Sequence, residues 1–388
     1  MGLGHRDKAF RQQVERLRDR LKKAGDTDAE TVERLLQATP STADLAPTKV
    51  EVSRFHGSGE SLTELVHPPV DRETSQPLCR IVMRPAATSA RPILAERSQR
   101  AFSDLAREWQ TLDRLAELGV APGRSCLIFG PPGTGKTMTA YHLAAELDLP
   151  VVDARIDGLI SSFLGTSARN IANLFAFANR YRCVLLLDEF DAIAKIRDDP
   201  QEIGEIKRVV NSLLQNLDDR AEIGLTIAIT NHHLLLDSAV WRRFENQIEL
   251  GLPDSNARAE ILARSLKPLP VNQTLLSLMV YVTEERSGAD LRRLCNAIKR
   301  LVALSEREPT AQVQFEIFRE VIAREPSTRS HHRAEMLADD LERFVVTAMD
   351  DPAFSLKQKP LGTLLAVNQG TISRWIHREE VQGKAHAQ

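Results

Sequence analysis

The sequence predicts an α/β protein in which a parallel sheet is sandwiched between helices and is followed by further helical units. Three observations carry this prediction. A glycine-rich loop at residues 130–137 lies between an apolar run and a helical run, which is the strand, loop and helix context of a phosphate-binding loop. Apolar runs alternate with helical patterns over residues 123–254, and the pattern is almost wholly helical over residues 255–325 and 334–388.

The alternating region contains the expected strands and helices of the sheet. Expected strands cover residues 126–129, 151–154, 183–187, 225–230 and 248–250. Helical patterns cover residues 93–118, 138–147, 168–181 and 203–217. Because strands that alternate with helices usually run parallel, we expect a sheet that is covered on both faces. Residues 79–83 form one further strand candidate.

The chain divides into five expected parts. They are an N-terminal helical module at 1–38, a proline-rich linker at 39–92, an α/β subdomain at 93–254, a helical lid at 255–325 and a C-terminal helical unit at 334–388. The N-terminal module carries one apolar stripe at helical spacing. It fits either a small hairpin that packs on itself or a module that binds a partner.

Composition excludes several classes of protein. The 388 residues carry a net charge of −2, so the whole molecule is not an electrostatic binder of nucleic acid. The four cysteines are far apart, which favours neither a zinc site nor a disulfide framework. No apolar run approaches the length of a membrane-spanning helix, and no signal peptide is evident. We therefore expect a soluble cytoplasmic protein with no membrane partner.

The phosphate-binding loop predicts a nucleotide site. Its residues are Gly130, Pro131, Pro132, Gly133, Thr134, Gly135, Lys136 and Thr137. Glycines allow successive backbone N–H groups to turn toward phosphate oxygens, and the following helix N-terminus adds partial positive charge. We expect Lys136 to reach the β and γ phosphates and the Thr137 hydroxyl to hold Mg²⁺. On this motif alone the nucleotide is ATP or GTP.

Two carboxylates follow the apolar run 183–187. At the carboxyl edge of a parallel sheet, Asp188 would lie beside the phosphates and hold the Mg²⁺ shell. Glu189 would polarise the attacking water, because hydrolysis needs a base in line with the γ phosphate. The alternative is an acidic pair that only caps a strand, which the upstream phosphate loop disfavours.

Further polar candidates follow the next strand. Asn231 directly follows residues 225–230 and would hydrogen-bond the γ phosphate and the lytic water, although asparagine also often ends strands. Arg242 and Arg243 are adjacent, and a guanidinium near a nucleotide can neutralise transition-state charge. From composition alone, a solvated or salt-bridged arginine pair is the simpler interpretation.

These motifs, in their order and spacing, resemble those of an AAA ATPase over about residues 95–305. The loop at 130–137, the Asp188-Glu189 pair, Asn231 and the Trp241-Arg242-Arg243-Phe244 segment are similar to the Walker A, Walker B, sensor 1 and second-region-of-homology motifs. The segment that contains Gly288 and Ala289 resembles the start of the lid helix that contacts adenine. The resemblance implies hydrolysis of ATP with Mg²⁺.

The resemblance also implies partners. The family forms rings that are usually hexameric, so Arg242 and Arg243 would act on the nucleotide of a neighbouring copy. Phe163, Leu164 and Gly165 match a pore loop that grips a substrate polypeptide. Ser162 stands where lysine is common, and a sensor-2 arginine is not evident. A looser similarity to stand-alone bacterial AAA ATPases, some of which accompany a protease, implies a protease or an adaptor protein as a partner.

The C-terminal unit contains a second resemblance. Residues 361–375 are similar to a helix-turn-helix of the phage-repressor type, with a turn near Val367 and with Ile372 and Trp375 inward. The residues expected to face a DNA groove are Gln369, Thr371, Ser373 and Arg374. The alternative is a helical module that contacts protein, which the mild basic charge favours.

Three hypotheses follow from the sequence. The first is an ATP-hydrolysing, ring-forming remodeller or unfoldase that acts on an unidentified protein substrate and is tethered to DNA by its C-terminal unit. The second is an ATP-dependent DNA-binding regulator or organiser that threads no polypeptide. The third is a scaffold that uses ATP only to assemble, which the presence of Glu189, Asn231 and the arginine pair disfavours.

Overall fold

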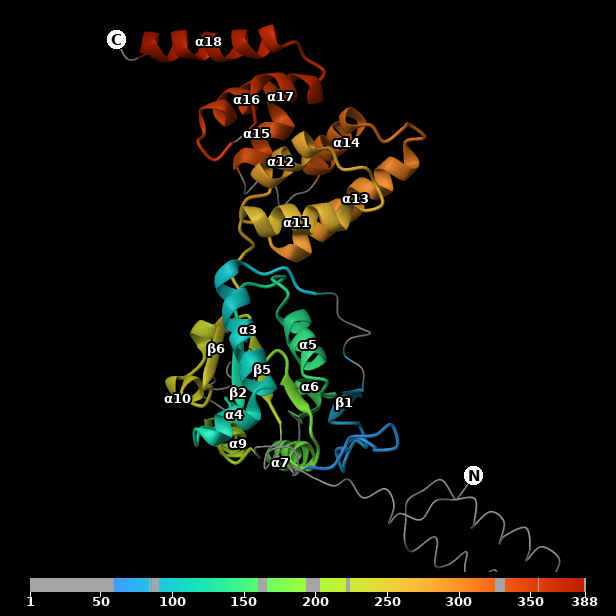
Figure 1. Ribbon diagram of the computed structural model, residues 1–388, viewed down its shortest axis with the longest axis vertical. Helices are drawn as coiled ribbons and strands as arrows, with labels where there is room; N and C mark the ends of the chain where they lie inside the picture. Colours follow the sequence, from blue (N-terminus) through green and yellow to red (C-terminus); the bar gives the residue numbers. More distant parts are fainter. Residues whose placement is uncertain are drawn as a thin grey trace, which may run out of the picture. The chain divides into compact units, whose positions relative to one another are not determined.

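The structure is a computed structural model of the 388-residue chain (Figure 1). It describes residues 59–83, 85, 91–159, 166–192, 203–220, 224–324, 332–354 and 356–386. The described residues all belong to one compact unit, Ser58–Gln388. The expected N-terminal module, the first part of the linker and the expected pore loop lie outside the described residues.

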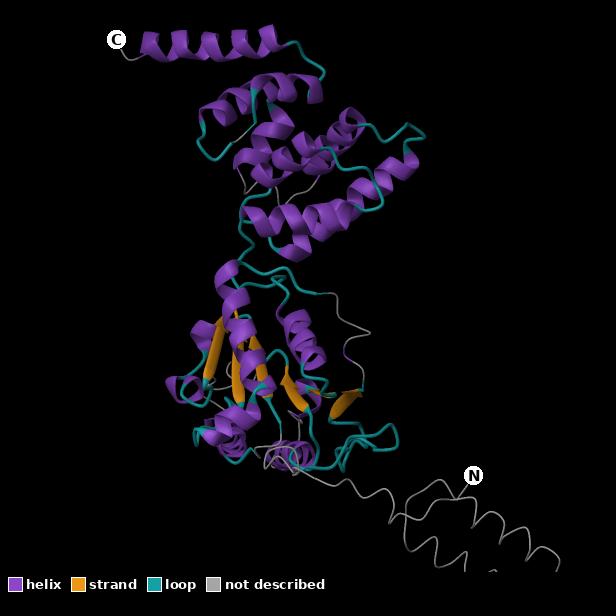
Figure 2. Ribbon diagram, in the orientation of Figure 1, coloured by secondary structure: helices purple, strands orange, loops and turns teal. Residues whose placement is uncertain are grey.

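A six-stranded sheet forms the centre of the α/β part (Figure 2). Its strands are β1 (Cys79–Val82), β2 (Ser125–Phe129), β3 (Val151–Ala154), β4 (Val184–Leu187), β5 (Thr226–Thr230) and β6 (Asn246–Glu249). Their order is β1-β3-β4-β5-β2-β6. Strands β2 to β6 pair in parallel, as the alternation of strands and helices predicts. β1 instead pairs antiparallel with β3 at the edge, where a parallel sheet often accepts such a strand.

Helices cover both faces of the sheet, which explains why the central strand β4 is apolar at every position. Successive residues of β4 belong to different cores. Leu185 and Leu187 pack with α7 (Thr166–Ala178) and α9 (Ile203–Asp218). Val184 and Leu186 pack with α3 (Glu96–Gln110) and α5 (Lys136–Glu146). Because side chains alternate along a strand, a sheet covered on both faces requires apolar residues without interruption.

Short helical elements complete this part. They are α4 (Leu112–Glu117), α6 (Ile156–Leu159), the 3₁₀ turn η3 (His233–Leu235) and α10 (Ser238–Trp241). The sequence predicted one helical run over 93–118, whereas the structure divides it at Thr111 into α3 and α4.

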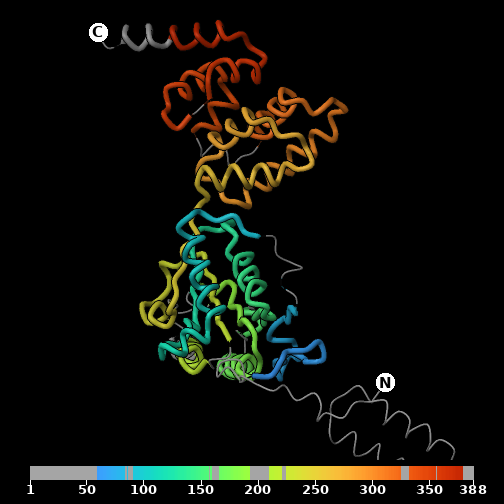
Figure 3. Tube along the Cα trace, in the orientation of Figure 1, coloured from blue at the N-terminus to red at the C-terminus, as the bar shows by residue number. Residues whose placement is uncertain are grey.

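The remaining helices lie in the regions that the sequence predicts to be the lid and the C-terminal unit (Figure 3). They are α11 (Ser255–Leu266), α12 (Gln273–Val282), α13 (Gly288–Leu304), α14 (Ala311–Arg324), α15 (His332–Asp339), α16 (Leu341–Asp350), α17 (Gln358–Leu364) and α18 (Gln369–His386). All belong to one hydrophobic core. Its fully buried members include Phe318 of α14, Phe344 of α16 and Ile372 of α18.

This shared core differs from the expectation of a separate C-terminal unit that begins at residue 334. Helices α15 and α17 both contact α12 and α14 of the lid. Each C-terminal helix has only one apolar face, so it gains burial by packing on the lid rather than by forming a core of its own.

Candidate functional site: a nucleotide site at the carboxyl edge of the sheet

The phosphate-binding loop joins the end of β2 to the start of α5, and its glycines occupy backbone conformations that other residues rarely adopt. The φ angles of Gly130, Gly133 and Gly135 are 141°, 76° and 95°. A Cβ atom at Gly130 would lie 2.1 Å from the carbonyl oxygen of Leu250. The loop therefore requires glycine both for its φ angles and for its close approach to neighbouring backbone.

The Lys136 ammonium lies folded against this loop. Nζ donates hydrogen bonds to the carbonyl oxygens of Gly130 at 2.9 Å and Pro131 at 2.7 Å. Burial lowers the pKa of Lys136, while the carboxylates of Asp188 and Asp191 act in the opposite direction. The structure thus holds a cation inside the loop, where phosphate oxygens would accept its hydrogen bonds.

Asp188 follows the last residue of β4 and faces the first turn of α5. The Thr137 hydroxyl Oγ1 donates to Asp188 Oδ2 at 2.7 Å. A hydroxyl and a carboxylate at this distance are oxygen donors of the kind that Mg²⁺ prefers, so the two residues fit a magnesium site. Magnesium held by these two residues would neutralise negative charge on the phosphates.

Glu189 is exposed and has a φ of 54°, which is unusual for a residue with a side chain. Its backbone N–H donates to Asp188 Oδ1 at 2.8 Å, and the next N–H, of Phe190, donates to the carbonyl oxygen of Ile229 at 2.8 Å. These bonds stabilise the strained turn. Strain of this kind concentrates at functional sites because the surrounding structure must maintain it.

Asn231 directly follows β5, which lies between β4 and β2. Asp188 and Asn231 therefore lie at the same edge of the sheet as the phosphate loop. Beside them is a buried polar contact that the sequence did not predict. Thr230 Oγ1 lies 3.3 Å from Asp191 Oδ1, and His232 Nε2 lies 4.0 Å from Asp191 Oδ2. Only the pairing of β4 with β5 brings these residues together.

The start of α13 adjoins the other side of the phosphate loop. The Ala289 N–H donates to the carbonyl oxygen of Gly133 at 3.0 Å. Ser287 begins α13 with a capping box, in which its hydroxyl accepts from the Asp290 N–H. The predicted residues Gly288 and Ala289 thus adjoin the loop. A pocket of about 20 Å³ beside them is lined by Ile93, Leu94, Thr134, Gly251, Ile261 and Gly288.

This pocket has a mostly apolar lining, and its volume is about that of one water molecule. Ile93, Leu94 and Ile261 had no signal in the sequence, because they come from separate segments that only the fold brings together.

The two adjacent arginines have different surroundings. Arg243 Nη1 donates to the carbonyl oxygen of Ala239 at 3.1 Å, and its guanidinium also pairs with Asp218. Arg242 is exposed, and its guanidinium makes no hydrogen bond or ion pair with any residue that the structure describes. The salt-bridged interpretation thus fits Arg243, and the solvated interpretation fits Arg242.

The expected pore-loop residues Phe163, Leu164 and Gly165 lie outside the described residues, between the end of α6 and the start of α7.

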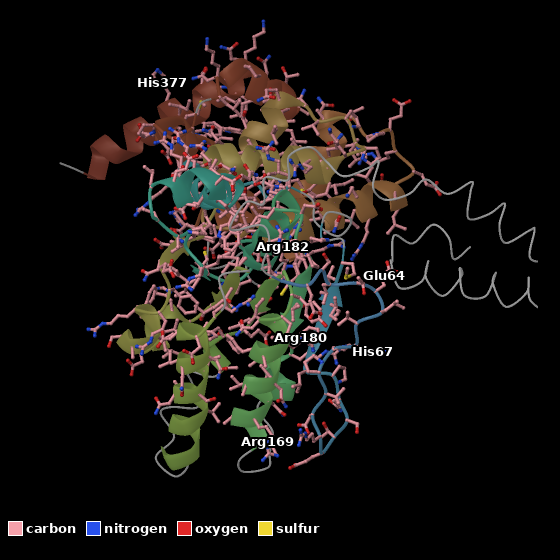
Figure 4. All side chains as sticks on the ribbon, turned by 60° about the horizontal axis from the view of Figure 1, so that its bottom comes forward. Glu64, His67, Arg169, Arg180, Arg182 and His377 are labelled. Carbon is pink, nitrogen blue, oxygen red and sulfur yellow. The ribbon has the colours of Figure 1, made fainter. Side chains whose placement is uncertain are left out.

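The C-terminal candidates lie on α18. Helix α17, a turn at residues 365–368 and α18 follow one another, and Ala366 has a φ of 56° in the turn. Ile372 is fully buried, while Gln369, Ser373 and Arg374 are exposed and Thr371 is half-buried. Figure 4 shows His377 further along the same helix.

The side chains of three of these candidates already have partners. Arg374 donates to Gly370 O at 3.2 Å and to Thr371 Oγ1 at 3.1 Å, and the Ser373 hydroxyl donates to Gln358 Oε1 at 3.1 Å.

Comparison with known proteins agrees with this geometry. The profile of the ATPase family associated with various cellular activities (AAA) matches residues 126–252. An uncharacterized AAA family ATPase of Sinorhizobium fredii, y4kL, is 32% identical over 318 residues, which cover 80% of this chain and 89% of the relative. A proteasome-activating nucleotidase of Saccharolobus solfataricus is 37% identical over 187 residues, 46% of this chain and 48% of the relative. This chain thus matches about half the length of that nucleotidase.

Among solved structures, the crystal structure of the FIGL-1 AAA domain matches with a TM-score of 0.51 at 22% sequence identity. The match covers 66% of this chain and 91% of the FIGL-1 chain. This likeness concerns the fold. Within the described residues, no helix has the length and apolar character needed to cross a membrane. The relative that matches over most of both chains and the phosphate site together establish that this chain belongs to the AAA family of ATPases and hydrolyses ATP.

Proposed function

We propose that the chain is a ring-forming remodeller that uses ATP hydrolysis to pull on a polypeptide substrate. The observation that carries the proposal is the state of Arg242. Lys136, Thr137, Asp188, Glu189 and Asn231 gather at one sheet edge, whereas the Arg242 guanidinium is exposed with no partner among the described residues. An exposed arginine of this kind suits a site that is completed by a second copy of the chain.

Each residue has a distinct proposed role. The loop from Gly130 to Lys136 binds the phosphates of ATP, and Thr137 and Asp188 hold Mg²⁺. Glu189 removes a proton from the attacking water, and Asn231 orients that water. Arg242 of a neighbouring copy stabilises charge on the γ phosphate in the transition state. We propose a hexamer and assign the grip on substrate to Phe163, Leu164 and Gly165.

The first test concerns hydrolysis and assembly. We expect Glu189→Gln to bind ATP and to lose phosphate release by about a hundredfold or more, because the water then lacks its base. With ATP bound, its mass in solution should be six times that of the 43.3 kDa chain. Phosphate release at the wild-type rate would show that Glu189 is not the base.

The second test concerns the substrate. Phe163→Ala should retain basal ATPase activity and lose the unfolding of a tagged fluorescent protein, because only the grip is removed. Several similar proteins have the name proteasome-activating nucleotidase, so a compartmental protease is the first partner to test, and an adaptor protein is the second. Unfolding by Phe163→Ala at the wild-type rate would contradict the proposed pore loop.

A second candidate function is attachment to DNA through α17 and α18. It is supported by the turn at Ala366, the buried Ile372 and the polar surface that includes Gln369, Ser373 and Arg374. Binding to duplex DNA should weaken as salt rises and weaken further in Arg374→Ala. ATPase activity that DNA stimulates and that Phe163→Ala leaves unchanged would favour a DNA organiser that threads no polypeptide. Absence of DNA binding at low salt would leave α18 as a protein-contact surface.

A further inference from the structure

Three aromatic rings meet at the carboxyl edge of the sheet. The ring centroids of Phe129 and Trp241 lie 5.1 Å apart with an interplanar angle of 81°, which is an edge-to-face contact. The His233 ring lies 5.0 Å from Phe129 and 6.4 Å from Trp241. All three side chains are half-buried. We call Phe129, His233 and Trp241 the ring cluster.

Each member of the ring cluster adjoins a different part of the nucleotide site. Phe129 is the last residue of β2 and directly precedes Gly130 of the phosphate loop. His233 lies two residues after Asn231, and Trp241 directly precedes Arg242. The sheet also places Phe129 beside the segment that contains Asn231, because Phe129 is the Cα partner of Thr230, the last residue of β5.

The turn at η3 is oriented by its histidine. Its other residues point away from the protein, since Leu234 is 87% exposed and Leu235 is 45% exposed. His233 is the member of the turn that packs inward, on Phe129 and Trp241. The ring contacts of His233 therefore help to hold the segment after Asn231, together with the buried Leu236 and the hydrogen bond from the His232 N–H to Thr230 Oγ1.

We propose that the ring cluster couples the phosphate loop to Asn231 and Arg242, with Phe129, His233 and Trp241 as positioning residues. The proposal rests on the proposed function, because it takes the roles of Asn231 and Arg242 from there. Aromatic pairs have preferred geometries, so a displacement of Phe129 when phosphates bind changes the packing of the other two rings. Trp241 transfers that change to Arg242, which serves the neighbouring copy. The nucleotide in one subunit thereby influences catalysis in the next.

The first test uses the fluorescence of Trp241. The chain has three tryptophans, so Trp109→Phe with Trp375→Phe leaves Trp241 as the only indole. In this protein, with Glu189→Gln added to preserve bound ATP, we expect ATP and ADP to shift the emission maximum by different amounts. Emission that is the same with ATP, with ADP and without nucleotide, although nucleotide binds, would overturn the coupling.

The second test is kinetic. Trp241→Ala and His233→Ala should each lower kcat for ATP by about tenfold and leave KM within about twofold, because the rings position catalytic groups and do not bind the nucleotide. Trp241→Phe and His233→Phe retain a ring, so they should restore most of the rate. Failure of both conservative variants to restore the rate would show that ring packing is not the cause.

A matched control separates this effect from a general loss of stability. Phe177 of α7 is also half-buried and packs against the core on the same face of the sheet. Its ring centroid lies 5.0 Å from that of Tyr181. Phe177→Ala should lower the melting temperature and leave kcat unchanged. Equal losses of kcat in Phe177→Ala and Trp241→Ala would show that the ring cluster contributes only to the stability of the core.

These tests also separate failure of the inference from failure of the proposed function. A chain that binds nucleotide but forms no ring still reports the link from the phosphate loop to Trp241 by fluorescence. Conversely, Glu189→Gln can abolish hydrolysis and form a hexamer while Trp241 emission stays unchanged, and then only the coupling is wrong.

Discussion

The Nε atom of Arg243 lies 3.3 Å from Oδ1 and 3.3 Å from Oδ2 of Asp218, the last residue of α9. This ion pair fixes the guanidinium of Arg243 to its own subunit. The neighbouring residue Arg242 extends from the end of α10 without such a partner among the described residues. Two arginines that are equivalent in the sequence are therefore expected to have separate tasks.

Substitution of each arginine should separate stability from catalysis. Arg242→Ala should lower kcat about a hundredfold or more and leave the melting temperature unchanged, because it removes charge stabilisation only. Arg243→Ala should lower the free energy of unfolding by at most about 1 kcal/mol, since the pair is partly exposed. Asp218→Ala serves as the control and should have the same stability as Arg243→Ala. If Arg243→Ala stops hydrolysis while Asp218→Ala does not, Arg243 is the catalytic arginine.

Gly133 should not tolerate even a methyl group. An added Cβ would lie 2.6 Å from Ser287 Oγ and 2.9 Å from Ala289 Cβ, at a φ of 76°. We expect Gly133→Ala to destabilise the protein by about 2 kcal/mol or more and to weaken ATP binding, because the lid contact and the loop both shift. Calorimetric measurement of ATP affinity and chemical unfolding would check both effects.

Gly119 offers the matched control for Gly133. Its φ is 71°, and an added Cβ would have nothing within 4 Å. Gly119→Ala should therefore cost only the backbone strain of about 1 kcal/mol and leave ATP affinity unchanged. Equal effects of the two substitutions would mean that the clash with the lid is absent in solution.

Asp71 should make the stability of the protein depend on pH. Its carboxylate accepts from the Glu73 N–H at 2.7 Å and from Asn170 Nδ2 at 2.9 Å, and these bonds, the first above all, lower its pKa below 3.8. A carboxylate with a lowered pKa stabilises the folded state above its unfolded pKa, and this contribution is lost as pH falls below about 3.8. Melting temperatures should therefore differ most between wild type and Asp71→Asn near neutral pH. A difference that grows toward about pH 3 would contradict this.

Arg333 should be important for the packing of the C-terminal helices on the lid. Its guanidinium pairs with Glu284, lies 2.8 Å from Asp351 Oδ2 and sits 4.1 Å from the centre of the Tyr281 ring. We expect Arg333→Ala to lower the free energy of unfolding by about 1–3 kcal/mol, because it leaves partly buried carboxylates without a partner.

The pair of Arg378 and Glu342 is the control for Arg333, since it also joins two C-terminal helices but is largely exposed. Arg378→Ala should change stability by less than about 1 kcal/mol. Guanidinium unfolding curves would give the free energy of unfolding of both variants. If Arg333→Ala and Arg378→Ala lose the same free energy, burial of the Arg333 contacts adds nothing beyond an ordinary ion pair.

The local elements of the fold could be predicted from the sequence. The bounds of β3 agree with the prediction, and those of β2, β4 and β5 differ by one residue at their start. The expected strand at 248–250 instead spans Asn246–Glu249, because only Ile248 of this edge strand is buried and polar residues hide its pattern. The phosphate loop was recognisable because strand, loop and helix are contiguous.

Contacts between distant segments could not be predicted. The antiparallel direction of β1, the contact of Asp191 with Thr230 and the meeting of Ile93 and Ile261 in one pocket all depend on how separate segments meet. Likewise, an amphipathic pattern indicates which face of α15 or α17 is buried without indicating its partner. For that reason the single core of the lid and the C-terminal helices appears only in the structure.

The single core that contains Phe318, Phe344 and Ile372 also constrains how the C-terminus can work. A flexibly tethered module would keep its own orientation while the ATPase changes shape. Helix α18 has no such independence, because Ile372 is fixed in the packing of the lid helices. Any molecule that bound α18, whether DNA or protein, would therefore move together with the helices that share this core. A binding surface on α18 would transmit every displacement of those helices to its partner.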